Sequence, residues 1–211
     1  MKIESINIAK PIEIDYAGRK VETGIYKTPV SQSVVVSKLG LDGDHIIDKS
    51  VHGGEDQAVY LYSQDDNEWW SKTLNRTIEP GTFGENLTIS SFSTDMLKIG
   101  DRLHINSVVL EITAPRTPCY KLANKMGDPK FVKTFVQAVK PGAYARVIEE
   151  GELNVGDEVT IEKCTQDYAL IHDIFIEWHT SKKSADTLKK ALESPISNHH
   201  RKTIESWLSN L

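Results

Sequence analysis

The chain has 211 residues, of which 39% are hydrophobic and 26% charged, and its formal net charge at pH 7 is −5. This length suits one domain of ordinary size with a small appendage, and the composition is that of a globular protein, which excludes wholesale disorder. The acidic balance argues against a general nucleic-acid binder, although a local basic pocket for an anionic small molecule remains open.

The cysteine content and the apolar segments restrict the class of protein further. Two cysteines, Cys119 and Cys164, are too few for a disulfide framework, a protein-ligated iron–sulfur cluster or a cysteine-rich zinc site. The first residues do not resemble a signal peptide, and no stretch approaches the ~20 apolar residues of a membrane span. We therefore expect a cytoplasmic protein with reduced thiols and no membrane partner.

The first two-thirds of the chain is expected to consist mainly of strands. Short runs rich in β-branched residues, many of them alternating, occur at 2–10, 20–27, 33–39, 58–63, 101–105, 108–113, 143–150 and 157–163. Turns containing glycine separate these runs. Many short strands joined in this way predict a mainly β fold with a closed or nearly closed β-barrel.

Two helices are expected to interrupt the strands. Residues 63–76 begin with Ser63, a residue typical of an N-cap, and carry acids in the first turn. Residues 128–140 offer Asp128 as N-cap and Pro129 as the first helical residue.

Beyond about Lys163 the pattern changes to three short helices, for which Asp167, Ser184 and Ser197 are the expected caps. We therefore predict a β-barrel domain at residues 1–163 and a small three-helix module at residues 164–211. Within the last helix, His199 and His200 are adjacent and favour a solvated helix face over a metal pair.

The segment "APRTPCYKLANKMG" (114–127) contains the strongest candidate for chemistry. Thr117 is a good N-cap and Pro118 fits the first helical turn, which places Cys119 at the second helical position. The backbone N–H groups there favour a thiolate, and Arg116 and Lys121 favour it too. The spacing leaves two interpretations open: a nucleophile or soft metal ligand, or a buried small hydrophobe. Cys164 lacks such a setting and is interpreted as structural.

Three further clusters are compatible with anion binding. "DKSVHGGEDQAVYLYS" (48–63) places Lys49 and His52 before a Gly-Gly turn, which suits a phosphate or a plain solvated hairpin. "PGTFGENLTI" (80–89) places Asn86 at a turn that binds a ligand or serves local structure. Arg146 lies in an otherwise apolar strand, where an inward side chain needs an anion and an outward one needs none.

Taken together, "KSVHGGEDQAVYLYS", "GTFGENLT", "IGDRLHI" and "APRTPCYKLA" resemble, in this order and at this spacing, the MOSC family (molybdenum cofactor sulfurase C-terminal domain) and its YiiM-like bacterial subgroup. The resemblance covers roughly residues 18–163, and the tail resembles the "3-alpha" module of that subgroup. It implies a MOSC β-barrel that binds a molybdopterin-type molybdenum cofactor, with Cys119 as the metal ligand. The residues it assigns to the cofactor pocket are Lys49, His52, Asn86, Arg116, Lys121 and Arg146.

The resemblance also implies an activity. Relatives in the family reduce N-hydroxylated compounds such as hydroxylaminopurine-type base analogues, which implies a two-electron reduction of a small-molecule N–OH group to the amine and water. Electrons would come from a separate flavin or iron–sulfur protein, and a homodimer is compatible with the resemblance. Two other functions remain: a sulfur carrier or transferase with a persulfide on Cys119, or a non-catalytic module that binds the pterin cofactor. The C-terminal helices would dock an electron-transfer partner or cover a barrel edge.

Overall fold

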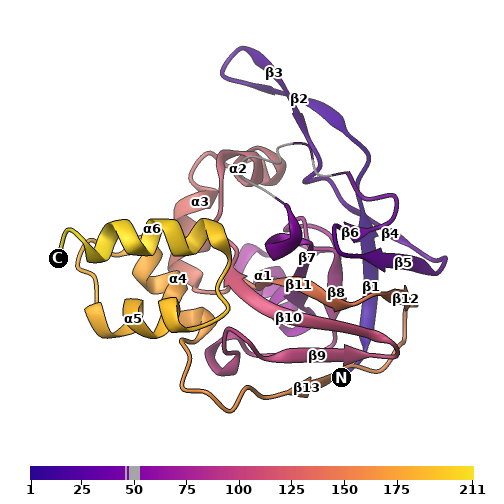
Figure 1. Ribbon diagram of the computed structural model, residues 1–211. Coiled ribbons are helices and arrows are strands. Elements are labelled where there is room, and N and C mark those ends of the chain that lie inside the picture. Colours follow the sequence, from indigo (N-terminus) through magenta and orange to yellow (C-terminus); the bar gives the residue numbers. More distant parts are fainter. Residues whose placement is uncertain (46, 48–52) are drawn as a thin grey trace.

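The computed structural model describes residues 1–45, 47 and 53–211. Within these residues the largest element is an eight-stranded sheet, drawn through the centre of Figure 1. In order across the sheet its strands are β13 (Thr160–Glu162), β9 (Arg102–Ile105), β10 (Val108–Pro115), β11 (Ala143–Glu149), β7 (Val59–Ser63), β8 (Leu87–Ile89), β1 (Ile3–Ile8) and β4 (Thr28–Val30). β7 and β8 run parallel, which brings the loop before β8 beside β7.

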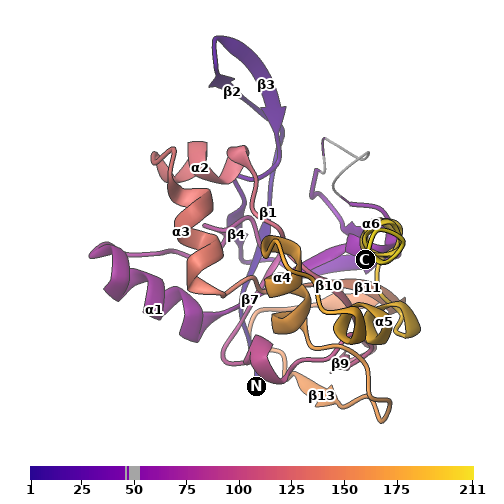
Figure 2. The same ribbon diagram turned by 90° about the vertical axis from the view of Figure 1, so that its left-hand side faces the viewer.

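Two smaller sheets flank the large one. The first has the order β12 (Gly151–Leu153), β5 (Val34–Ser37) and β6 (Gly40–Leu41). The second is the hairpin of β2 (Ile12–Tyr16) and β3 (Arg19–Thr23). This hairpin stands away from the body in both views (Figures 1 and 2), and its base leads directly into the segment that precedes β4.

The predicted closed barrel is wrong, since the large sheet of the described residues is open. Its edge strands β13 and β4 have three residues each, and Pro29 in β4 has no N–H with which to extend the ladder. β1 does reach the segment before β13, where Ile3 N–H donates to Asp157 O at 2.9 Å and Val159 N–H donates to Met1 O at 2.8 Å. This contact forms an isolated bridge rather than a ladder.

The expectation of a mainly β fold is also wrong, because helices and strands each take 30% of the residues. The described helices are α1 (Gln64–Leu74), α2 (Tyr120–Met126), α3 (Phe131–Ala138), α4 (Ile171–His179), α5 (Ala185–Glu193) and α6 (Asn198–Leu208), with 3₁₀ turns η1 (Glu55–Gln57) and η2 (Thr94–Met96). In the part of the chain that the structure describes, every helix falls short of the length and apolar character that crossing a bilayer requires.

Helix starts follow the predicted caps in some places and not in others. α1 begins after Ser63 as predicted, although the Ser63 side chain makes no capping hydrogen bond. α3 begins two residues later than predicted, because the Asp128 carboxylate accepts the N–H of Lys130 at 2.8 Å and so holds a turn before the helix.

The C-terminal helices have two of their three predicted caps. Ser184 accepts the N–H of Thr187, and Ser197 accepts the N–H of His200. The third prediction is wrong: Leu170 is the N-cap of α4, and Asp167 instead pairs with Lys190 at 2.7 Å.

The three C-terminal helices share an apolar core with the sheet. β10 contributes Leu110 and Ile112, and the helices contribute Ile171, Leu188 and Ile204 to the same buried cluster. In Figure 1 the three helices gather at one end of the strands. The boundary at residue 163 stays a prediction, and the structure adds that one core extends across it.

A second buried cluster is aromatic and lies among α1, α3 and the sheet. Trp70 of α1 stacks on Phe135 of α3, with ring centroids 5.9 Å apart and planes inclined by 8°. Its indole N–H donates to the Tyr62 hydroxyl at 2.8 Å. Phe83 and Tyr60 belong to the same cluster and also line the pocket described below. The cluster therefore gives the pocket a rigid apolar support.

Candidate functional site

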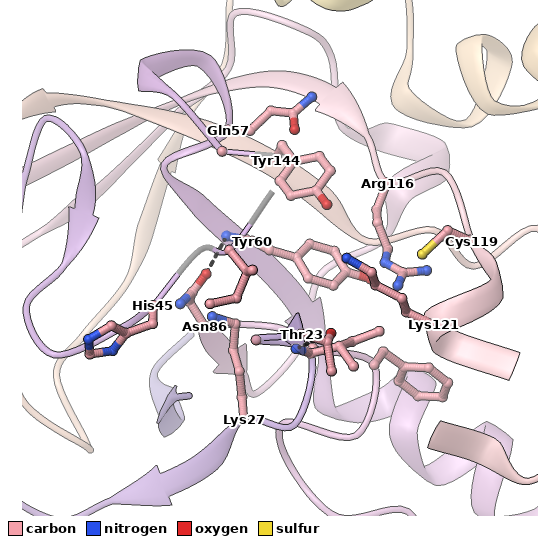
Figure 3. Close-up of a pocket in the computed structure, with 16 residues that line it drawn as sticks. Thr23, Lys27, His45, Gln57, Tyr60, Asn86, Arg116, Cys119, Lys121 and Tyr144 are labelled. Atoms are coloured by element: carbon pink, nitrogen blue, oxygen red, sulfur yellow. Dashed lines mark hydrogen bonds between the residues drawn. The ribbon is translucent and has the colours of Figure 1, made fainter. Parts of the chain in front are cut away.

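A pocket of about 650 Å³, part of it open to solvent, lies where the base of the β2–β3 hairpin, β7, the loop before β8 and the start of α2 meet (Figure 3). Its lining residues are Thr23, Gly24, Ile25, Lys27, His45, Ile47, Gly53, Gln57, Tyr60, Phe83, Gly84, Asn86, Arg116, Cys119, Lys121 and Tyr144.

Cys119 lies in this pocket and is the N-cap of α2, not its second helical residue. Its carbonyl accepts the N–H of Leu122 at 3.0 Å, and its backbone is extended, with φ −128° and ψ 173°. The cap predicted at Thr117 is therefore two residues too early. Cys164 lies elsewhere, after β13, where its N–H donates to Asp101 at 2.8 Å. Both cysteines are partly exposed thiols.

Arg116 is a buried cation at one side of the pocket. It is 4% exposed, and within the described residues its guanidinium has no carboxylate partner and its Nη1 has no hydrogen-bond partner. The guanidinium carbon lies 5.7 Å from the Tyr60 ring centroid and 5.5 Å from that of Phe135. Burial would lower the pKa of Arg116, but the neighbouring Tyr60, Tyr144 and Cys119 raise it. A buried cation without a counter-ion favours binding of an anion.

Lys121 adds a second positive charge beside Cys119. It is 8% exposed, and its ammonium group has no ion pair among the residues that the structure describes. In Figure 3 the Cys119 sulfur and the Lys121 ammonium lie next to the Arg116 guanidinium, on the other side of Tyr60 from His45 and Asn86. This side of the pocket therefore combines a thiol with two cations.

The opposite wall is a hydrogen-bonded network around Asp44. Its carboxylate accepts from the Lys27 ammonium, from Asn86 Nδ2 at 2.8 Å and from the N–H of Ala9 at 2.8 Å. Burial lowers the pKa of Lys27, and the nearby Asp44 opposes this shift without cancelling it. Asn86 Oδ1 accepts the N–H of Tyr60 at 3.1 Å, so both ends of the Asn86 amide are used within the protein. Asn86 therefore faces the pocket as predicted, and it shapes the wall.

The turn before β8 is built around the buried carboxylate of Glu85. It accepts the N–H groups of Gly81 at 2.6 Å and Phe83 at 3.0 Å. Burial raises the pKa of Glu85, and these hydrogen bonds oppose the rise. A Cβ on Gly81 would lie 2.6 Å from Lys27 O, and φ at Gly81 is +82°, so glycine is required here. The sequence left two roles open for this turn, ligand binding and local structure. The hydrogen bonds of Glu85 serve local structure.

Of the residues predicted for the cofactor site, the structure places Cys119, Arg116, Lys121 and Asn86 around one pocket, but it does not bring Arg146 there. The Arg146 guanidinium pairs with Asp56 at 2.7 Å and Glu111 at 3.4 Å, and donates to Pro195 O at 2.9 Å. These partners satisfy its charge inside the protein. Lys49 and His52 lie outside the described residues.

Sequence reasoning missed several lining residues, among them Lys27, Tyr60 and Tyr144. Tyr60 and Tyr144 occur within motifs that were singled out for other residues. Lys27 follows a predicted strand, where a lysine is normally solvated, and its burial depends on Asp44, which lies in a separate loop. A pairing of this kind has no local sequence signal.

The MOSC domain family model matches residues 48–160. The chain belongs to the MOSC domain family. The match spans the pocket residues from Gly53 to Tyr144, and so includes Cys119, Arg116 and Lys121.

Known relatives agree with this assignment. The chain is 37% identical over 152 residues to protein YflK of Bacillus subtilis, covering 72% of this chain and 69% of that protein. It is also 31% identical over 150 residues to a protein named reductase from Gibberella moniliformis, covering 68% of this chain and only 26% of that protein.

A solved structure matches over nearly the whole length. YiiM from Geobacillus stearothermophilus superposes with a TM-score of 0.81 at 29% identity, covering 98% of each chain. The chain is therefore a MOSC protein of the YiiM-like type, C-terminal helices included.

Proposed function

We propose that this protein is a molybdenum-cofactor oxidoreductase that reduces N-hydroxylated small molecules, such as hydroxylaminopurine-type bases, with Cys119 as the protein ligand of the metal. MOSC domains are associated with binding of the molybdenum cofactor. The named reductase among the relatives supports an oxidoreductase, although the shared region is about a quarter of that protein.

The observation that carries the proposal is the buried guanidinium of Arg116 beside Cys119, which has no carboxylate partner among the described residues and an Nη1 without a hydrogen bond there. A buried cation with an orphaned Nη1 costs free energy unless an anion satisfies it. The pterin of the cofactor carries a phosphate, and Arg and Lys suit phosphate oxygens. Thiolate is a soft ligand and suits molybdenum. The described residues of the pocket therefore fit the cofactor.

Each group of residues has a separate task. When bound, the cofactor supplies the two-electron redox chemistry. Arg116 and Lys121 bind its anionic part, and Cys119 offers its Sγ to the metal. Phe83, Ile25 and the Tyr60 ring exclude water from the pocket. Lys49 and His52 belong to the same proposal, but they lie outside the described residues.

The proposal includes the partners. Electrons come from a separate flavin or iron–sulfur protein, since the chain has only two cysteines, too few to ligate a cluster of its own. The substrate is a small N-hydroxylated molecule, and the setting is the cytoplasm.

The deciding experiment measures molybdenum and pterin per chain in protein purified from a host that makes the cofactor. Three proteins are compared: wild type, Cys119→Ser, and Cys164→Ser as the matched control. We expect near-stoichiometric molybdenum in the wild type and in Cys164→Ser, and little in Cys119→Ser. Turnover of an N-hydroxylated purine with a chemical reductant then tests the activity.

The other outcomes separate the alternatives. Wild type without molybdenum but with a persulfide on Cys119 would replace this proposal with sulfur transfer. Bound cofactor without turnover of any N-hydroxylated substrate would replace it with a cofactor carrier.

A further inference from the structure

Lys125 lies on α2, two turns beyond Cys119, and joins this helix to two other segments. Its ammonium group donates to the carbonyl of Ile25 at 2.9 Å and to the carbonyl of Gly81 at 2.6 Å. It also lies over the Tyr26 ring, 5.3 Å from the centroid. One side chain thus reaches both the 23–27 segment and the 81–86 loop.

These two segments form the wall of the pocket opposite α2. Ile25 lines the pocket from the first segment, and Gly84 lines it from the second. The segments are pressed together: a Cβ on Gly84 would lie 2.8 Å from the Ile25 side chain. Lys125 therefore binds the two segments near the place where they touch each other.

A neighbouring contact supports the same arrangement. Asn124 accepts from the Tyr26 hydroxyl at 3.1 Å and donates to the carbonyl of Asp15 at 3.2 Å. Consecutive residues of α2 thus hold the segment that leads out of the hairpin. Loss of the Lys125 ammonium would leave the carbonyls of Ile25 and Gly81 without this donor.

The charges around Lys125 are mixed. Burial lowers its pKa to about 8; the carboxylate of Glu85 opposes this shift, whereas the cations Arg116 and Lys27 add to it. The phenol of Tyr26 faces it from the remaining side. Lys125 therefore loses its positive charge near pH 8. A pH titration can thus test what the charged ammonium group contributes to the pocket.

We propose that Lys125 is a positioning residue of this pocket: it holds the 23–27 segment and the 81–86 loop against the helix that begins at Cys119, and so sets the width of the pocket. The inference rests on the proposed function, because it takes the pocket to be an anion and cofactor site. Lys125 itself does not line the pocket and acts through the backbone of the two segments.

The test uses cofactor-free protein and sulfate as the probe, since the charge of sulfate is constant between pH 6 and 10. The variants are Lys125→Met, Lys125→Arg and, as a control for the lost charge, Lys133→Met on the exposed side of α3. Calorimetry gives the dissociation constant, and circular dichroism establishes that each variant folds. We expect Lys125→Met to weaken sulfate binding about tenfold, and Lys125→Arg and Lys133→Met to stay near the wild type. Molybdenum content after expression in a cofactor-making host should follow the same order.

A pH titration separates positioning from a general loss of structure. In the wild type, sulfate binding should weaken as the pH rises through 8, and in Lys125→Arg this step should be absent, because arginine stays charged. The proposal is overturned if Lys125→Met binds sulfate as tightly as Lys133→Met, or if the wild type and Lys125→Arg show the same pH profile. Should Lys125→Met fail to fold, the comparison of the wild type with Lys125→Arg decides alone.

An Arg116→Met variant, measured in parallel, separates this inference from the function it rests on. Unchanged sulfate binding in Arg116→Met would contradict the proposal that this pocket is an anion site. Loss of binding in Arg116→Met together with full binding in Lys125→Met would remove only the role of Lys125.

Discussion

Asp56 and Arg146 form an ion pair of 2.7 Å that joins η1, beside the pocket, to strand β11. The second carboxylate oxygen of Asp56 accepts the N–H of Asn198 at 2.7 Å, at the first residue of α6. Arg146 in turn donates to Pro195 O at 2.9 Å. The pair therefore fastens the C-terminal helices to the segment that carries Gln57 into the pocket.

Replacing Asp56 by alanine should reduce stability through this junction. We expect the free energy of unfolding to fall by about 1–3 kcal/mol, because Arg146 and the α6 N-terminus both lose a charged acceptor. Urea denaturation followed by circular dichroism measures the change. Glu55→Ala, at the exposed neighbouring residue, is the control and should differ little from the wild type. Equal stability of the two variants would contradict the prediction.

Arg116 and Arg146 should respond in opposite ways to the same substitution. In cofactor-free protein, Arg116→Met should leave the free energy of unfolding unchanged or raise it by up to about 2 kcal/mol, because it removes a buried charge that has no carboxylate partner among the described residues. Arg146→Met should lower it by about 1–3 kcal/mol, because it leaves Asp56 and Glu111 without their cation. Urea denaturation of both variants makes the comparison, and a strong loss of stability in Arg116→Met would show that this side chain serves the fold.

His200 should make the protein less stable in acid. The prediction of a solvated pair was wrong for this residue: His200 is 1% exposed, packs on Trp178 with ring centroids 4.4 Å apart, and shares a hydrogen bond of 2.8 Å between its Nδ1 and the Ser197 hydroxyl. Burial lowers its pKa to about 3, and the nearby His199 adds to the shift. Between pH 6.5 and 3 the unfolded chain binds a proton that the folded protein does not, so stability falls as the pH falls.

At pH 5 the protonation of His200 in the unfolded chain lowers the free energy of unfolding by roughly 2 kcal/mol relative to neutral pH. His200→Asn keeps an acceptor for Ser197 and removes the titration, so its stability should change less between pH 7.5 and 5 than that of the wild type. His199→Asn, at the exposed neighbour, should keep most of the wild-type change, because burial is the larger cause of the His200 shift. Urea denaturation at the two pH values gives the change in the free energy of unfolding of each protein. An equal change in all three proteins would contradict the assignment of this pH dependence to His200.

Ser184→Ala should lower the free energy of unfolding by about 1 kcal/mol, the usual cost of losing a capping hydroxyl at a helix N-terminus. The hydroxyl accepts the N–H of Thr187 at 3.3 Å. Thermal denaturation measures the loss. Ser93→Ala is a matched control, because the exposed Ser93 precedes η2 without a capping hydrogen bond from its side chain.

Local patterns were sufficient to predict the parts of the fold that depend on neighbouring residues. The alternation of β11 and the caps at Ser184 and Ser197 are confirmed, whereas β10 is buried along almost its whole length. The start of α2 was misplaced because Thr117 and Pro118 are also compatible with an extended lead-in, and the helix begins only where the Cys119 carbonyl accepts its first bond.

The errors concern contacts between distant segments. Closure of the sheet depends on the length of the edge strands, which composition does not determine. The pocket wall around Asp44 joins residues from three segments, and no local pattern marks Lys27 as buried. The orientation of Arg146 was left open by the alternation, and its acidic neighbours decide it. Cys119 lines the pocket, but its own motif left open whether the thiol serves chemistry or packing, and its role stays a prediction.

The pairing of β1 has a consequence for the order of events during synthesis. β1 is made well before β8 and the segment around Asp157, with which it forms backbone hydrogen bonds. At ~5–20 residues per second, the apolar side chains of Ile3 and Ile6 wait roughly 10 s or more for their last neighbours. A nascent chain of this protein therefore exposes the apolar side chains of β1 until the segment around Asp157 has been made, and it is a natural client for chaperones that bind near the exit tunnel.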